Sequence, residues 1–85
     1  GTLDAVPTIV EIRKKAENIR MQEIEKTLKK ISYLSEDDKK LLHQMSSSIV
    51  SKILHKPTIK LKQKTQSEDG HVYLKAIRHL FHLDD

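Results

Sequence analysis

One segment of the chain, from Leu41 to Leu54, carries apolar residues over an unusually wide arc of the helix that it is expected to form. A helix with one wet side needs an apolar stripe of only about 100°. The apolar positions that make the wider arc are Leu41, Leu42, Met45, Ile49, Val50, Ile53 and Leu54. An arc of this width predicts two burial partners. One can be the preceding helix in an antiparallel hairpin, and the other must lie elsewhere in the chain or on a second chain.

The small size of the chain favours a second chain as that other partner. A domain of 85 residues buries only roughly 60 % of the surface that its unfolded chain exposes. The sequence has no cysteine, so no disulfide or thiolate zinc site can stabilise it, and only 4 % of its residues are aromatic. We therefore expect one domain over residues 1–85 that self-associates through the wide arc. The alternative is a compact monomeric bundle with an aliphatic core.

The apolar pattern is helical, because alternation with period two is absent throughout the sequence. We expect helices over about residues 7–30, 36–56 and 72–83. Pro7 suits the first helical position, where its missing N–H would have no partner in any case. The sequence thus predicts an all-α fold, in which a helical hairpin and a C-terminal helix form a symmetric helical dimer.

The ends of these helices are marked by residues with known local preferences. Ser35, with Asp38 three residues later, resembles a weak capping box. Pro57 disfavours helix at the residue before it. A kinked continuation over residues 58–66 remains open, because no helix breaker follows. Residues 63–71 are polar and include a glycine, which predicts a flexible connection.

The first expected helix carries two sets of apolar residues that lie on different faces. The sets are Ile9, Ile12, Ala16 and Ile19, and then Met21, Ile24, Leu28 and Ile31. At 100° per residue the second set is rotated by roughly a third of a turn. This rotation predicts a change of buried face, with Ile12 and Ile19 touching one element and Ile24 and Leu28 another. The charged residues between the sets predict a solvent-exposed face with surface ion pairs: Glu11, Arg13, Lys14, Lys15, Glu17, Arg20, Glu23, Glu25 and Lys26.

The residues that catalysis or cofactor binding requires are scarce. There is no cysteine nucleophile and no glycine-rich phosphate loop, since Gly1 and Gly70 are the only glycines. His79 and His82 are three residues apart, which could place two imidazoles near one metal ion. A simpler explanation is that histidine cations near a helix C-terminus interact favourably with the helix dipole. We expect no catalytic, cofactor-binding or metal site. No apolar run approaches the length of a membrane span, so we expect no membrane partner and a cytoplasmic location.

Lysines are concentrated in the middle of the chain. Seven of them lie between Asp38 and Glu68, where there is no acidic residue. This charge suggests a free-standing basic helical nucleic-acid-binding module as an alternative function. The segment has no aromatic or arginine side chain on which bases could stack, so only attraction to phosphate remains. A third interpretation is a small adaptor for the helix of another protein.

Three segments, in this order and at this spacing, resemble the C-terminal dimerisation domain of glutamyl-tRNA reductase. They are Ala5-Val6-Pro7-Thr8-Ile9, Ile53-Leu54-His55-Lys56-Pro57-Thr58 and Tyr73-Leu74-Lys75-Ala76-Ile77-Arg78-His79-Leu80-Phe81. The resemblance extends from about Leu3 to Leu83. One departure is His82, where the family pattern predicts glycine, so the last helix would lack its usual C-terminal cap.

The resemblance implies the function of a longer parent protein. Glutamyl-tRNA reductases use NADPH to reduce glutamyl-tRNA to glutamate-1-semialdehyde, the first step of tetrapyrrole (porphyrin) biosynthesis. In this family the catalytic cysteine and the NADPH site lie in other domains, so no catalytic or cofactor residue carries over to this chain. The resemblance therefore implies a homodimerisation domain that contains neither NADPH nor the glutamyl-tRNA reaction site.

Overall fold

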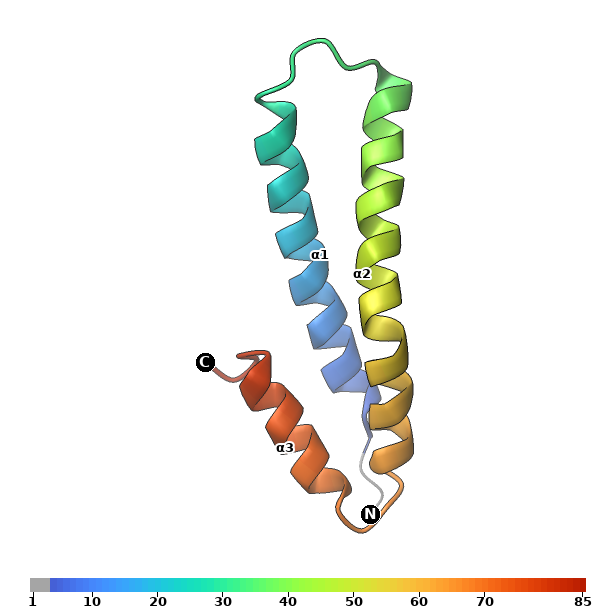
Figure 1. Cartoon of the computed structure of the whole chain (residues 1–85). Coiled ribbons are helices and arrows are strands. Elements are labelled where there is room, and N and C mark those ends of the chain that lie inside the picture. Colours follow the sequence, from blue (N-terminus) through green and yellow to red (C-terminus); the bar gives the residue numbers. More distant parts are fainter. Residues whose placement is uncertain (1–3) are drawn as a thin grey trace.

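The computed structural model describes residues 4–85, and within this range it consists of three helices without a strand. The helices are α1 (Val6–Leu28), α2 (Glu36–Lys64) and α3 (Gly70–Leu80). Figure 1 shows α1 and α2 side by side as a long antiparallel hairpin, with α3 beside the end at which α1 begins. The molecule is elongated, at 54 × 24 × 15 Å. The predicted all-α fold, a hairpin plus a C-terminal helix, is confirmed. Residues 1–3 of the expected domain lie outside the described range.

The capping box at the start of α2 is present. The Ser35 hydroxyl accepts a hydrogen bond from the Asp38 backbone N–H at 3.1 Å, and the Asp38 carboxylate accepts one from the Ser35 N–H at 3.3 Å. At the start of α1 the Asp4 carboxylate accepts a hydrogen bond from the Val6 N–H at 2.9 Å. Side chains therefore satisfy backbone donors that have no partner within the helix.

Pro57 does not end the second helix, so the predicted end at residue 56 is wrong. The helix is continuous over 29 residues, and the continuation over 58–66 is its last part, up to Lys64. Proline inside a helix costs about 3 kcal/mol because one backbone hydrogen bond is lost. Burial of Leu54 and Leu61 on either side of Pro57 offsets this cost, at roughly 1.5–3 kcal/mol for each side chain. Thr58 is also buried, and its hydroxyl donates to the His55 carbonyl at 2.9 Å.

The connection between α2 and α3 is shorter than predicted. It covers residues 65–69 rather than 63–71, and α3 begins at Gly70 and ends at Leu80 rather than spanning 72–83. The start of α3 packs directly on the end of α2. A Cβ atom on Gly70 would lie 2.8 Å from both the Lys64 carbonyl oxygen and the Thr65 Cα atom. Glycine is therefore required by this close approach of two backbones.

The main core sits at the end of the hairpin where all three helices meet. Ala5, Ile9 and Leu61 are buried together there, and Leu74 and Ile77 of α3 pack against them. Next to them along α1, Ile12 is only 1 % exposed. Toward the connection between α1 and α2, the buried hydrophobic residue of α1 is Ile24. The hairpin is thus well packed at one end and sparsely packed at the other.

The first helix does change its surroundings along its length, but Ile19 does not lie where it is predicted. Ile12 is buried, whereas Ile19 is 55 % exposed and lines the same hollow as Ile24. The reason is that α3 extends beside only the first part of α1 (Figure 1). Beyond that part, Ile19 borders the groove between α1 and α2 instead of a packed helix.

Candidate functional site

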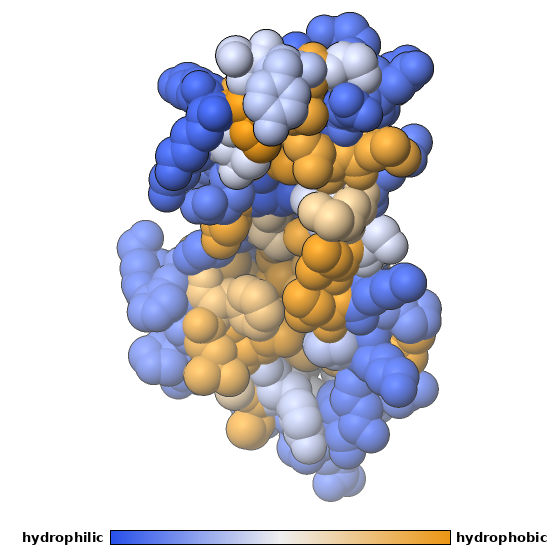
Figure 2. All heavy atoms as spheres, turned by 45° about the horizontal axis from the view of Figure 1, so that its top comes forward, coloured by the Kyte–Doolittle hydropathy of each residue, from blue (hydrophilic) through white to orange (hydrophobic). Residues whose placement is uncertain are grey.

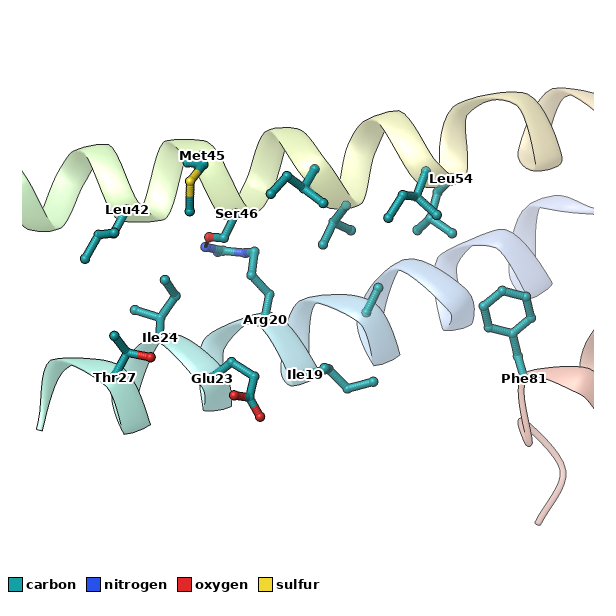
Figure 3. A pocket seen from close by; sticks show the side chains of 14 residues that line it. Ile19, Arg20, Glu23, Ile24, Thr27, Leu42, Met45, Ser46, Leu54 and Phe81 are labelled. Atoms are coloured by element: carbon teal, nitrogen blue, oxygen red, sulfur yellow. Dashed lines mark hydrogen bonds between the residues drawn. The ribbon is translucent and has the colours of Figure 1, made fainter. Parts of the chain in front are cut away.

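An apolar groove of about 510 Å³ runs between α1 and α2. Figure 2 shows apolar side chains gathered along this face of the molecule, with hydrophilic side chains on both sides. The close view in Figure 3 shows the groove walls contributed by α1 and α2 and the Phe81 ring at one end. The lining residues are Ala16, Ile19, Arg20, Glu23, Ile24, Thr27, Leu42, Met45, Ser46, Ile49, Val50, Ile53, Leu54 and Phe81.

Four large aliphatic side chains, which we call the aliphatic row, form an exposed line along α2. They are Leu41, Met45, Ile49 and Ile53, at one-turn intervals and between 51 % and 65 % exposed. Large contiguous apolar patches are uncommon on monomeric proteins and mark interaction surfaces. The aliphatic row borders the groove, so the two together make one continuous apolar face.

The structure separates the seven predicted interface residues into three groups. The four of the aliphatic row are exposed, and Leu42 and Val50 are half-buried beside the groove. Leu54 is only 5 % exposed, because it lies at the packed end of the groove, next to the core. It is therefore already buried within its own chain. Six of the seven residues remain accessible to a partner.

Eight of the residues that line the groove were not in the predicted interface, and two of them are the large apolar residues Ile19 and Phe81. Ile19 reaches it from α1, and Phe81 closes it from the residue directly after α3. From its spacing in the sequence, Phe81 could be assigned to the inner face of the last helix but not to the groove. Its position beside the hairpin depends on how α3 is anchored, which the sequence pattern does not specify.

Arg20 lies inside the groove rather than on the predicted solvent face. Its side chain is only 10 % exposed. It donates hydrogen bonds to the Glu17 carboxylate at 2.9 Å, the Ser46 hydroxyl at 3.1 Å and the His43 carbonyl at 3.3 Å. The hydrogen bond from Arg20 also holds the pKa of Glu17 below its ordinary value. The spacing Ala16, Arg20, Ile24 was the signal for this inward position, because residues four apart share one helix face.

Polar contacts fasten the end of α3 to α1. Arg78 donates to the Glu11 carboxylate at 3.1 Å, to the Thr8 hydroxyl at 3.1 Å and to Asp84 at 2.7 Å. These contacts lower the pKa values of Glu11 and Asp84, chiefly through the hydrogen bonds from Arg78. From α1, Lys15 donates to the Phe81 carbonyl at 2.7 Å. Together they fix Phe81 at the end of the groove.

The last helix does have a C-terminal cap, contrary to the expectation drawn from His82. The backbone of His82 is left-handed, with φ of 53°. The Leu83 N–H then donates to the Arg78 carbonyl at 2.9 Å, which is the bond that glycine usually permits at this position. Lys15 adds a hydrogen bond to the His82 carbonyl at 3.3 Å. Histidine thus takes the conformation of the glycine that it replaces.

Residues 4–85 contain no group of three or more His, Asp or Glu side chains that could hold a metal ion. No helix in this part of the chain is long and apolar enough to cross a membrane. The candidate functional site is the apolar groove with its aliphatic row, because this is where large apolar side chains remain exposed.

A small helical hairpin with a large exposed apolar face is typical of helical domains that associate with another protein surface. Comparison with known families identifies the member of that class. The family model described as "Glutamyl-tRNAGlu reductase, dimerisation domain" matches residues 1–83. The chain belongs to this family, and the resemblance seen in its sequence is confirmed.

Curated relatives give the same result. The chain is 39 % identical over 84 residues to a glutamyl-tRNA reductase of Heliobacterium mobile, covering 99 % of this chain and 19 % of the relative. It is 40 % identical over 83 residues to a glutamyl-tRNA reductase of Carboxydothermus hydrogenoformans, covering 98 % of this chain and 18 % of the relative. The chain thus spans about a fifth of the length of the relatives that it matches. No solved structure matches it.

Proposed function

We propose that this chain is the homodimerisation domain of a glutamyl-tRNA reductase, and that two copies meet through the groove and the aliphatic row. The observation that carries the proposal is the aliphatic row itself. Leu41, Met45, Ile49 and Ile53 remain at least half exposed although the chain has folded. Covering the exposed half to two thirds of each side chain would contribute about 1–2 kcal/mol, a share of the roughly 1.5–3 kcal/mol for burying a whole one.

A twofold symmetric pairing suits the shape of this face. In such a dimer the same patch is used by both copies, so it must complement itself. Successive members of the aliphatic row are about 40° apart around α2, and the row spans about 18 Å along the helix axis at 1.5 Å per residue. Two such rows can cross near their middle, between Met45 and Ile49, and bring the members nearest the crossing against the partner.

The activity of the longer parent is inferred from its relatives. We infer that the parent acts on glutamyl-tRNA, uses NADPH as reductant and serves tetrapyrrole biosynthesis in the cytoplasm. Within residues 4–85 the one glycine, Gly70, is packed against the Lys64 and Thr65 backbone, which does not fit the glycine-rich phosphate loop of an NADPH site. The contribution of this chain to the parent is to hold two catalytic chains together. No specific contact favours the nucleic-acid-binding alternative.

The test is a charge placed in the centre of the aliphatic row. Ile49→Asp would bury an unpaired carboxylate in both copies of a symmetric seam, which is strongly unfavourable. We expect light scattering to show the unmodified chain as a dimer and Ile49→Asp as a monomer with unchanged helical circular dichroism. The matched control is Ile59→Asp, because Ile59 is 43 % exposed on the same helix but does not line the groove. An unmodified chain that remains monomeric at high micromolar concentration would contradict the proposal.

A further inference from the structure

The exposed face of α2 changes in charge from one end to the other. Its middle is the aliphatic row, from Leu41 to Ile53. Asp38 is exposed just before the row, and Lys52 and Lys56 are exposed where the row ends. At 100° per residue, these three charged residues lie within about 40° of the centre of the row. The face is therefore acidic at its start, apolar in its middle and basic at its end.

The two charged ends of this face are not neutralised within the described chain. In residues 4–85 no side-chain ion pair involves Asp38, Lys52 or Lys56. The Asp38 carboxylate accepts a hydrogen bond from the Ser35 N–H at 3.3 Å, which leaves its negative charge in place. Because α2 is one continuous helix (Figure 1), Asp38 and Lys56 of one copy are held about 27 Å apart along the helix axis. Each end can therefore meet an opposite charge on a second molecule.

The direction in which two copies pair decides which of these charges meet. In a parallel twofold pair each residue lies opposite itself, so Asp38 would face the partner's Asp38, and Lys56 the partner's Lys56. In an antiparallel pair that crosses between Met45 and Ile49, residues equally far from position 47 lie opposite each other. Asp38 and Lys56 are each nine residues from position 47, so Asp38 would face the partner's Lys56. The charge pattern is thus repulsive in the parallel pair and attractive in the antiparallel pair.

We propose that the α2 helices of two copies pair antiparallel, with Asp38 of each copy beside Lys56 of the other, and that this charge pattern rejects the parallel pair. The inference rests on the proposed function, because it gives the direction of the same homodimer. At a crossing angle of about 20° the two axes move only about 5 Å further apart at these positions, which a lysine side chain can span. Exposed ion pairs contribute little affinity, so the aliphatic row provides the affinity and the charges select the direction.

A distance between two spin labels tests the direction of pairing. The chain has no cysteine, so Gln63→Cys provides a single site for a nitroxide label at an exposed position of α2. Each label would lie about 24 Å along the helix from the crossing point, so an antiparallel dimer places the two labels about 48 Å apart. A parallel dimer places them within about 25 Å, because packed helix axes are 8–10 Å apart. Double electron–electron resonance should give a distance above about 40 Å, and a shorter distance would overturn the proposal.

A charge reversal tests the pair of Asp38 and Lys56 itself. Lys56→Glu would place two carboxylates side by side at both ends of an antiparallel dimer. We expect sedimentation equilibrium at low salt to show the dissociation constant raised about tenfold or more, because two attractive pairs become repulsive. Adding Asp38→Asn should return the constant to within about threefold of the unmodified value, since the amide lacks the charge but keeps an oxygen for the Ser35 N–H. An unchanged constant for Lys56→Glu, or a loss that Asp38→Asn does not reduce, would overturn the proposal.

The matched control for the charge reversal is Lys62→Glu. Lys62 is exposed on the same helix but lies about 120° around it from Lys56. Its reversal should leave the dissociation constant within about threefold, because exposed charges away from the seam contribute little. An equal loss for Lys62→Glu would show an effect of net charge alone and would overturn the proposal. A monomeric unmodified chain would remove the proposed function, whereas a dimer with closely spaced labels removes only this inference.

Discussion

The two ends of the hairpin are built from the same two helices but bury very different amounts of side chain. At the packed end, where α3 joins, Ile12 is 1 % exposed and Leu61 is 4 % exposed. At the open end, along the groove, residues of similar size such as Ile49 are about half exposed. The same helix, α2, thus contributes buried core residues at one end and exposed apolar residues at the other. The packed end can fold from one chain, whereas the open end offers its apolar surface for association.

The polar contacts also differ between the packed end and the open end. At the packed end Arg78 and Lys15 tie α3 to α1, and this fixes the position of Phe81. At the open end Arg20 joins α1 to α2 within apolar surroundings. The first set of contacts completes the core of the chain. The second lies in the face that we assign to the partner.

The largest expected difference between the two ends is in the free energy of unfolding that is lost when an isoleucine is replaced by alanine. Ile12→Ala should lower the free energy of unfolding by about 2–5 kcal/mol, because it leaves a cavity in the core. Ile49→Ala should have little effect on the isolated chain, since its side chain is half exposed. Urea denaturation at concentrations below the dimer dissociation constant would measure both. Equal losses would show that the two ends do not differ as described.

A smaller effect is expected from the C-terminal cap of α3. His82→Gly should raise the free energy of unfolding by about 1 kcal/mol, because a left-handed backbone penalises residues with a Cβ atom. The matched control is His79→Gly, which lies inside α3 and should instead destabilise the chain by roughly 0.5–1 kcal/mol. Thermal denaturation would measure the sign of both changes. Destabilisation by both would show that His82 gains more from its side chain than its backbone loses.

The smallest effect is the pH dependence of the contacts around Arg78. Glu11 and Asp84 have pKa values below their ordinary ones because of Arg78, so the folded chain holds their protons less tightly than the unfolded chain. Their contribution is complete above the ordinary values, near pH 4, and is lost as the pH falls through the lowered values. The melting temperature should fall below about pH 4, and Arg78→Met should weaken this dependence. An identical pH profile for Arg13→Met and Arg78→Met would contradict the assigned cause.

Much of the fold could be predicted from the sequence because its signals are local. Ser35 and Asp38 three residues apart form the capping box that their identities predict. The end of α2 could not be predicted in this way. Pro57 opposes helix locally, and only the burial of Leu54 and Leu61 against other elements outweighs it. Tertiary packing therefore sets the C-terminal end of α2, which is the helix boundary where the sequence prediction differs most from the structure.

The candidate site could be predicted only in part, because some of its features are local in sequence and others depend on distant contacts. The width of the apolar arc on α2 identified the aliphatic row, because helix periodicity places those residues without knowledge of their neighbours. It could not separate Leu54, which packs near the core, from Ile53, which is exposed. Nor could it place Arg20 in the groove, because charged residues are usually assigned to water. That position depends on acceptors that α2 contributes from a distant part of the sequence.

The central claim is that the open end of the hairpin is completed by a second copy. Isotope-filtered nuclear Overhauser spectroscopy on a mixture of labelled and unlabelled chains tests it most directly, because it detects only contacts between copies. The account predicts contacts from the Ile49 and Ile53 methyl groups to the partner's α2, and none from Ile12. Contacts between copies confined to α3, or none at all in a sample that is dimeric by light scattering, would contradict it.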